Sequence, residues 1–224
     1  MSHDLQTPLS SILGVFDSLL SPDGNLSDEQ SKHLISLGQE QSERLLRQVR
    51  NLLSISKVDG GALKISLQNL RPQDCVKSAL KAFPRQDQNR IQIQDDSNGV
   101  DIWADPSLLS VLLANLLDNA LKFSSPESLV EIRIQQRNQD CHIDVMDSGC
   151  GILPQDQDKI FERFYRGQTP KKLPGSGLGL HICKVMSELQ HATLTYSPRT
   201  PIGSCFTLQL PLVSNQKLTK DSQT

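Results

Sequence analysis

The sequence predicts an α+β protein in which a hairpin of two antiparallel helices precedes an α/β layer. Apolar residues recur at helical spacing in the first part of the chain, whereas the later part alternates as strands do. Strands outnumber helices there and are joined by short turns, which favours a mixed or antiparallel sheet backed by helices on one face. We therefore expect a helical domain over residues 1–61, an α/β domain over residues 62–212 and a polar tail over residues 213–224.

The helical part is predicted to hold two helices that meet at residues 21–25, a run rich in turn-forming residues. Ser27 and Gln30 match a capping box at the start of the second helix, and Gly60 and Gly61 mark its end. One hairpin cannot bury its apolar seams alone, so we expect a dimer that completes a four-helix bundle. The predicted seams are Leu5, Leu9, Ile12, Phe16 and Leu19 or Leu20, then Leu34, Leu37, Gln41, Leu45, Val49, Leu52 and Ile55.

In the α/β part we expect a strand over residues 63–67, where leucine and isoleucine alternate with polar residues, and a short helix after Pro72. Asp105 followed by Pro106 predicts the start of a longer helix, because a carboxylate caps helices and a proline opens them. Another helix is predicted over residues 179–190, and further strands over residues 90–94, 100–104, 129–137, 141–147, 193–197 and 204–210.

Composition argues against several classes of function. With 23 basic and 25 acidic residues the chain is nearly neutral, which gives no reason to expect bulk binding of nucleic acid or of a membrane surface. No apolar run approaches the roughly 18–20 residues of a membrane span and no signal peptide is visible, so we expect a cytoplasmic location. The five scattered cysteines are typical of reduced thiols rather than of a metal site or a disulfide framework.

A polar stripe runs along the predicted helix that Asp105 opens. At about 100° per residue, Asn115, Asn119 and Lys122 fall within an arc of roughly 60°, apart from the leucines of the same helix. Amide oxygens are ligands suited to Mg²⁺, and a lysine ammonium suits phosphate. A solvated polar face would explain this stripe equally well on its own.

Asp147 directly follows a predicted strand and precedes Gly149 and Gly151. Glycines let a ligand come close to the backbone, and the carboxylate could accept a hydrogen bond from an exocyclic amine such as that of adenine. Taken alone, an ordinary Asp-Gly turn is the favoured explanation.

A Gly-rich run over residues 175–179 leads into the last predicted helix, and such a helix N-terminus can bind an anion. It is not a Walker A loop, because no Gly-Lys-Ser/Thr follows. It is not a dinucleotide fingerprint either, because a polar loop and not a strand precedes it. That loop, residues 168–174, is predicted to be a lid whose Lys171 and Lys172 can reach phosphates.

The first helix carries His3, Asp4 and Thr7, with His3 and Thr7 one turn apart on the same face. A neutral imidazole is a competent nucleophile, and a neighbouring carboxylate can fix its tautomer and take its proton. The Thr7 hydroxyl could orient a water. A surface histidine without a role is the ordinary alternative for His3 alone.

In order along the chain, these motifs resemble the H, N, G1, F and G2 boxes of sensor histidine kinases of two-component systems. Each box alone is unspecific, but all five follow in the family's order at similar spacing, up to about Leu212. The first and last boxes are most similar to potassium-responsive sensors of the KdpD type. Without this resemblance, the aromatic residues Phe161 and Phe164 would be explained as a packing plug. The boxes are His3-Asp4-Leu5-Gln6-Thr7-Pro8-Leu9, Asn115 with Asn119-Ala120 and Lys122-Phe123-Ser124, Asp147 with Gly149 and Gly151, Phe161 with Phe164, and Gly175 with Gly177 and Gly179.

The resemblance implies a dimeric helical hairpin joined to an α/β sandwich of the histidine kinase, gyrase and Hsp90 type, which binds ATP with Mg²⁺. It implies that His3 accepts the γ-phosphoryl group, polarised by Asp4, and passes it to an aspartate of a response regulator. Thr7 would position water if the protein also dephosphorylates that regulator, and Asn119 would bind Mg²⁺. The other implied nucleotide-binding residues are Asn115, Lys122, Phe123, Asp147, Gly149, Gly151, Ile152, Phe161, Lys172, Gly175, Gly177, Leu178 and Gly179.

Two features depart from the family pattern. His3 is the third residue, whereas the family's first helix extends well before its histidine, so we expect a truncated fragment with weak phosphorylation. The parent protein could be anchored in the inner membrane. Residues 190–192, Gln-His-Ala, stand where family members commonly turn on glycines.

Two other functions fit parts of the sequence. The same nucleotide fold serves Ser/Thr-directed kinases and ATPases of the gyrase or chaperone type, although His3 and Thr7 on a helical hairpin argue against these. A nucleotide-binding adaptor, which holds partners without efficient turnover, is the alternative that is not an enzyme.

Overall fold

The computed structural model describes residues 2–21, 26–59, 64–167 and 176–213, except the side chains of residues 2–5, 40, 43–44, 47–48 and 50–59. One compact unit comprises residues 1–63 and a second comprises residues 64–173 and 177–224. None of the helices within the described ranges is long and apolar enough to cross a membrane.

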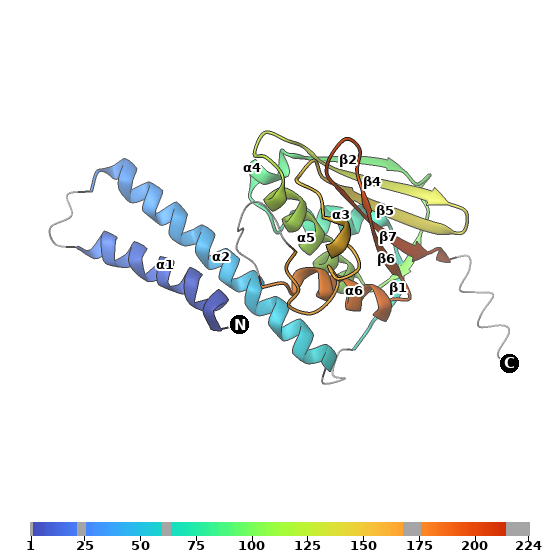
Figure 1. Ribbon diagram of the computed structural model, residues 1–224, viewed down its shortest axis with the longest axis horizontal. Coiled ribbons are helices and arrows are strands. Elements are labelled where there is room, and N and C mark those ends of the chain that lie inside the picture. The colour runs from blue at the N-terminus through green and yellow to red at the C-terminus, as the bar shows by residue number, and fades with distance from the viewer. Residues whose placement is uncertain (1, 22–25, 60–63, 168–175, 214–224) are drawn as a thin grey trace. The chain divides into compact units, whose positions relative to one another are not determined.

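The first unit is a hairpin of α1 (Ser2–Leu20) and α2 (Asp28–Asp59), shown in Figure 1. The capping box is confirmed, because the Ser27 N–H donates to Gln30 Oε1 at 2.9 Å and the Gln30 N–H donates to Ser27 Oγ at 3.2 Å. The two helices approach closely at Gly38, where an added Cβ would lie 3.2 Å from Cγ1 of Val15.

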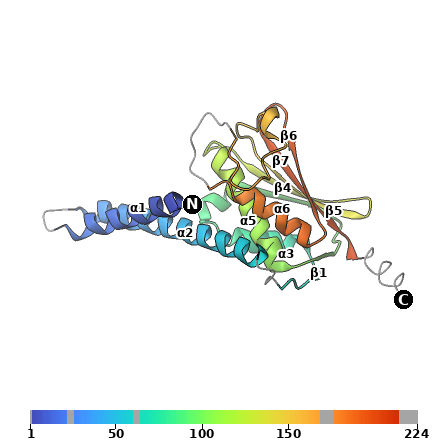
Figure 2. The ribbon, with the colours of Figure 1, turned by 60° about the horizontal axis from the view of Figure 1, so that its bottom comes forward.

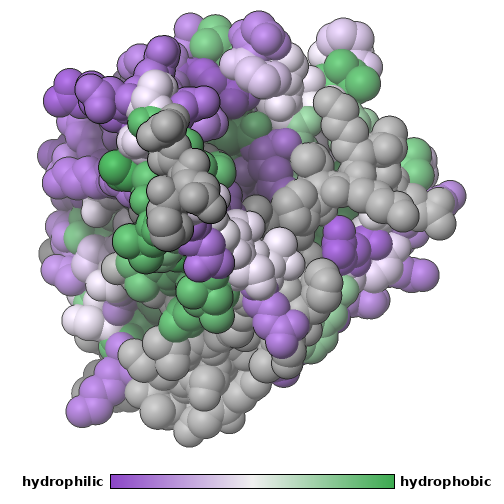
Figure 3. All heavy atoms as spheres, turned by 90° about the vertical axis from the view of Figure 1, so that its left-hand side faces the viewer, coloured by the Kyte–Doolittle hydropathy of each residue, from purple (hydrophilic) through white to green (hydrophobic). Residues whose placement is uncertain are grey.

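Within one chain, the predicted seam of α1 is covered in part. Val15 is buried, with Ile12 and Leu19 half-buried beside it in the helical repeat, whereas Leu9 and Phe16 are 48% and 54% exposed. The reason is that α1 carries two apolar stripes and the single α2 of the same chain covers one of them. The uncovered stripe consists of Leu9, Leu13, Phe16 and Leu20. Figure 3 views the side on which the hairpin turn lies and shows hydrophobic residues gathered at the surface there.

The second unit contains a mixed five-stranded sheet in the order β2-β4-β5-β7-β6, in which only β2 and β4 run parallel. Helix α5 contacts α3, α6 and the sheet, so the three helices lie on one face (Figures 1 and 2), as predicted. The elements are β1 (Gln68–Leu70), α3 (Pro72–Leu80), α4 (Arg85–Gln88), β2 (Ile91–Asp96), β3 (Ile102–Ala104), α5 (Pro106–Phe123), β4 (Val130–Arg137), β5 (Asp140–Met146), the 3₁₀ turn η1 (Pro154–Asp156), α6 (Gly179–Leu189), β6 (Thr193–Pro198) and β7 (Ser204–Pro211).

The strand predicted over residues 63–67 is wrong for the described residues 64–67, which form no strand. Strand β1 instead covers Gln68–Leu70 and pairs antiparallel with β3, so that Leu70 lies opposite Ile102. Alternation shows that a segment can be extended, but the position of the partner decides which residues enter the ladder.

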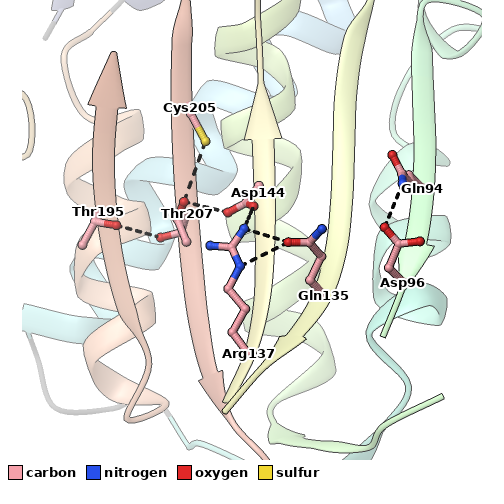
Figure 4. A network of polar contacts seen from close by, with 8 residues as sticks. All are labelled: Gln94, Asp96, Gln135, Arg137, Asp144, Thr195, Cys205 and Thr207. Atoms are coloured by element: carbon pink, nitrogen blue, oxygen red, sulfur yellow. Dashed lines mark hydrogen bonds and ion pairs between the residues drawn. The ribbon is translucent and has the colours of Figure 1, made fainter. Parts of the chain in front are cut away.

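The hydrophobic core lies between the sheet and α5. Residues of β4, β5 and β7 that point to the helices are buried, as are the leucines of α5. On the other face, Asp144 accepts hydrogen bonds from Arg137 and Thr207, each at 2.7 Å, within a polar network (Figure 4). The sheet is therefore apolar on one side only, and this keeps α5 and α6 on the face that carries the candidate site. The main core residues are Ile132, Ile134, Ile143, Val145, Leu208, Leu109, Leu112, Leu113 and Leu116.

Asp105 caps α5 as predicted and also joins three segments. Its Oδ1 accepts from the N–H groups of Ser107 (2.9 Å) and Leu108 (3.1 Å), and its Oδ2 accepts from that of Ser66 (2.7 Å). Its own N–H donates to Oε1 of the buried Gln190 at 2.9 Å. The start of α5 and the end of α6 are thereby held together.

The turn after α6 is formed without glycine. His191 adopts a left-handed conformation with φ 57°, and the Ala192 N–H donates to the Ser187 carbonyl at 2.9 Å. The side chain of Gln190 donates to the Met186 carbonyl at 2.9 Å. The buried, hydrogen-bonded side chain of Gln190 therefore lies next to a non-glycine residue in a left-handed conformation.

The turn between β6 and β7 ends at Gly203, which has φ 127° and lies against the backbone of Asp147. A Cβ on Gly203 would collide with the carbonyl oxygen of Asp147. The predicted strands over residues 193–197 and 204–210 imply a connection here, but the sequence gives no sign that it touches the candidate site.

We expect Gly203→Ala to lower the free energy of unfolding of the α/β unit by about 1–3 kcal/mol, through both backbone strain and the clash. Ile202→Ala, in the same turn and 55% exposed, should change it by less than about 0.5 kcal/mol. Urea denaturation followed by the fluorescence of Trp103, the single tryptophan, measures both values. Equal stability of Gly203→Ala and the wild type would contradict the close approach.

Candidate functional site

The amide stripe of α5 lies beside the N-terminus of α6. A Cβ on Gly179, the first residue of α6, would lie 3.8 Å from Oδ1 of Asn115 and 3.9 Å from Nδ2 of Asn119. Both asparagines are half-buried, and Nδ2 of Asn115 donates to the Val111 carbonyl at 3.0 Å. Two side-chain amides and the first N–H groups of a helix, which lack partners within the helix itself, therefore share one small region.

Asp147 lies just after β5 and is 3% exposed. Its Oδ1 accepts from the N–H groups of Gly149 at 2.7 Å and Ser204 at 3.2 Å. Burial raises the pKa of the Asp147 carboxyl, and these hydrogen bonds oppose the rise. The result is a buried acceptor whose Oδ1 receives two backbone hydrogen bonds.

Gly149 brings the turn of Asp147 against the end of α5. A Cβ at this position would lie 2.5 Å from the carbonyl oxygen of Phe123, so any larger residue would push the two segments apart. Gly151 has φ 68° and faces the backbone of Gly203. The structure thus brings the turn after β5 and the amide-bearing helix into direct contact.

Gly177 and Leu178 lead into α6 from the other side. Gly177 has φ 69°, and its carbonyl accepts from the Phe164 N–H at 3.0 Å. A Cβ there would lie 2.7 Å from the carbonyl oxygen of Tyr165, while Leu178 is buried. Lys171, Lys172 and Gly175, like the whole loop 168–174, lie outside the described residues.

The remaining candidates on the α/β unit are aromatic or basic. The Lys122 ammonium lies 5.2 Å from the centroid of the Phe123 ring, and both residues are half-buried. Phe161 packs edge-on against Phe206 with centroids 6.4 Å apart. Ile152 is half-buried in the turn after Asp147. Phe161 is thus half-buried against a strand residue, as expected of a packing plug.

The N-terminal candidates belong to the other unit. His3 and Asp4 lie in the first turns of α1, and their side chains fall outside the described part. Thr7 lies one turn further along α1 and is exposed.

Asn115 and Asn119 could offer amide oxygens to a cation near the start of α6. In the described ranges no three His, Cys, Asp or Glu side chains are grouped so as to hold a metal. Mg²⁺ suits such a site, because it binds few protein groups and takes its other ligands from water and phosphate. The amides of Asn115 and Asn119 at a helix start fit that requirement.

Three residues near Asp147 escaped the sequence analysis, namely Gly203, Ser204 and Tyr196. The first two abut Asp147, and the Tyr196 hydroxyl accepts from the Ile152 N–H at 3.3 Å. They lie some 50 residues beyond the turn they contact, and only the pairing of β7 with β5 brings them there. The Pro-Ile-Gly turn at residues 201–203 was the one signal in the sequence.

Two family models match this chain. The model described as His Kinase A (phospho-acceptor) domain matches residues 1–61. The model described as Histidine kinase-, DNA gyrase B-, and HSP90-like ATPase matches residues 104–214. The α/β unit is thus of a type that uses ATP.

Individual proteins agree with these models. Sensor protein KdpD of Clostridium acetobutylicum is 32% identical over 215 residues, which make up 94% of this chain and 24% of KdpD. The chain therefore spans about a quarter of that relative, and KdpD-type signalling stays a prediction.

Two solved structures share the fold. Histidine kinase AdeS of Acinetobacter baumannii superposes with a TM-score of 0.68 at 23% identity, over 94% of this chain and 98% of that one. Histidine kinase ThkA, solved in complex with response regulator protein TrrA, gives a TM-score of 0.65 at 17% identity, over 94% and 59%. The two family models and the similarity to KdpD place the chain among the sensor histidine kinases of two-component systems, of which it is a protein-histidine kinase core.

Proposed function

We propose that this chain autophosphorylates His3 from Mg-ATP and passes the phosphoryl group to an aspartate of a response regulator. Residues 1–61 would carry the phosphoacceptor and residues 62–212 the nucleotide. The observation that supports this most is the meeting of Asn115 and Asn119 with the N-terminus of α6, next to the turn that bears Asp147.

Asp147 would bind the adenine. Its Oδ1 is engaged by Gly149 and Ser204, and Oδ2 would accept from the exocyclic amine of the base. An ionised carboxylate accepts hydrogen bonds and cannot donate them. It therefore favours adenine, which carries an amine at that position, over guanine, which carries a carbonyl there. Gly149 and Gly151 would let the base lie against the backbone.

The phosphates would lie at the start of α6, where the N–H groups of a first helical turn lack partners within the helix and the helix dipole has its positive end. Asn119 would contribute an amide oxygen to Mg²⁺, with Asn115 and Lys122 near the phosphates. When bound, Mg²⁺ neutralises charge on the phosphate oxygens. Lys172 and Gly175 stay predictions for the same part of the site.

His3 would act as the nucleophile. A lone pair of its neutral imidazole attacks the γ-phosphorus, the N–P bond forms, and the bond to the leaving oxygen of ADP breaks. Asp4 would hold the other ring nitrogen in the N–H form and stabilise the positive charge that develops on the ring. Catalysis by the rest of the chain consists of positioning and charge stabilisation. A role of Thr7 in regulator dephosphorylation stays a prediction.

Homodimerisation through the hairpin is part of the proposal. The uncovered stripe of α1 and several exposed apolar residues of α2, among them Ile35 and Leu46, would be buried in a four-helix bundle. The response regulator is proposed from the family, and ThkA supplies an example of such a complex. The two alternative functions are not favoured, since a phospho-acceptor domain model covers the hairpin.

With γ-labelled ATP, the chain should acquire acid-labile, base-stable label, which is lost in His3→Gln. The reason is that a phosphoramidate hydrolyses in acid, whereas a Ser or Thr phosphoester survives it. His33→Gln, an exposed histidine of α2, serves as the matched control and should keep the label. Acid-stable label, or label that persists in His3→Gln, would refute the assignment.

Asn119→Asp should weaken Mg-dependent ADP binding at least about tenfold, because a carboxylate in this place repels phosphate and loses the amide donor. Calorimetry with and without Mg²⁺ measures this. Asn138→Asp, in the exposed turn between β4 and β5, makes the same chemical change away from the site and should bind as the wild type does. Unchanged binding by Asn119→Asp would remove Asn119 from the site.

Adenine binding should weaken on acidification at a pH above that expected for an ordinary aspartate. Burial raises the pKa of Asp147, and the protonated form accepts poorly from the amine, so affinity is lost as the pH falls through that raised value. Asp147→Asn should bind ADP about 10- to 100-fold more weakly at neutral pH and show a flatter pH dependence. Calorimetry at several pH values measures the affinity of both proteins. If the affinity of Asp147→Asn changed with pH in parallel with that of the wild type, Asp147 would be excluded as the titrating group.

A further inference from the structure

Tyr196 of β6 reaches the turn that follows Asp147. Its hydroxyl oxygen accepts a hydrogen bond from the N–H of Ile152 at 3.3 Å. The same turn is held at its other end, because the Gly149 N–H donates to Asp147 at 2.7 Å. The segment between Asp147 and Ile152 is therefore fixed at both ends, once by its own carboxylate and once by a tyrosine from a distant strand.

The ring of Tyr196 belongs to an aromatic bridge of Tyr196, Phe206 and Phe161. The centroids of Tyr196 and Phe206 lie 5.4 Å apart, and those of Phe206 and Phe161 lie 6.4 Å apart in an edge-to-face arrangement. Nδ1 of His181, in the first turn of α6, lies 3.1 Å from the Phe161 carbonyl oxygen. The aromatic bridge thus links the turn of Asp147 to the start of α6.

The phenol of Tyr196 is suited to remain a neutral hydrogen-bonding group. Burial raises its pKa, while hydrogen bonds with the Ile152 N–H and Ser204 oppose the rise. Ser204 in turn donates its N–H to Asp147. The polar end of Tyr196 therefore lies among the groups that hold Asp147, although it belongs to the edge strand of the sheet.

We propose that Tyr196 is a positioning residue for adenine, which keeps the turn from Asp147 to Ile152 in the conformation that receives the base. The inference rests on the proposed nucleotide site. Tyr196 has no proposed contact with the phosphates. Loss of the Tyr196 hydroxyl should therefore weaken nucleotide binding and leave the rate of the chemical step unchanged. A purely structural tyrosine would instead affect stability without a selective effect on binding.

Tyr196→Phe in the full chain removes the hydroxyl and keeps the ring of the aromatic bridge. We expect the Kd for ADP, measured by calorimetry, and the KM for ATP to rise about three- to tenfold, because the Ile152 N–H loses its acceptor. The kcat of autophosphorylation should stay within about twofold. Thr195→Val is the matched control, since the Thr195 hydroxyl donates to the Thr207 carbonyl at 3.5 Å, and this variant should bind ADP as the wild type does.

A Kd of Tyr196→Phe within about twofold of the wild type, or an equal loss in Thr195→Val, would overturn the inference. Should Tyr196→Phe fail to fold, amide hydrogen exchange of Ile152 in the wild type decides. Protection of that amide before ADP is added supports the inference, and exchange at the rate of a free amide refutes it. A wild type that binds no adenine nucleotide would refute the proposed function itself.

Discussion

The close approach of two backbone segments, the turn after β5 and the end of α5, constrains the whole α/β unit. At Gly149 there is no room for a Cβ beside the Phe123 carbonyl. Because the segments touch here, Asp147 and the amides of α5 come to lie in one region. A larger residue at this position would separate the base-binding and phosphate-binding parts of the proposed site without altering either.

The buried carboxylate of Asp147 is the second constraint, since an ionised group inside a protein needs hydrogen-bond donors. Two backbone N–H groups supply them, one from its own turn and one from Ser204. Ser204 is in place because Met146 lies opposite Cys205 in the antiparallel pair of β5 and β7. The register of the sheet thus controls the chemistry of the site, and a slip by one residue would remove a donor.

The two units differ in how completely they bury their apolar residues. The α/β unit buries the leucines of α5 and one face of its sheet, so it has a complete core of its own. The hairpin leaves a second apolar stripe exposed on α1, with Phe16 more than half accessible. Such a surface is costly in water, which agrees with a role of the hairpin in binding a second copy.

Several features could be predicted because they depend on interactions between residues that are close in the sequence. The carboxylate of Asp105 and the pair Ser27 and Gln30 are helix caps that act over a few residues, and both are confirmed. The mixed sheet with helices on one face follows from the order of the elements. The strand over residues 63–67 was wrong, because a strand needs a partner and the local pattern does not show where that partner lies. Burial of Leu9 and Phe16 in a seam stays a prediction, because a second copy of the hairpin would have to cover them.

By itself, the sequence determined most of the helices and strands and which residue types carry the candidate chemistry. Only the tertiary structure decided that Gly203, Ser204 and Tyr196 surround the turn of Asp147. Periodicity and capping depend on neighbours along the chain, whereas these contacts arise when β7 pairs with β5 and β6 pairs with β7. The long-range register of the sheet therefore brings motifs that are separate in the sequence together in one site.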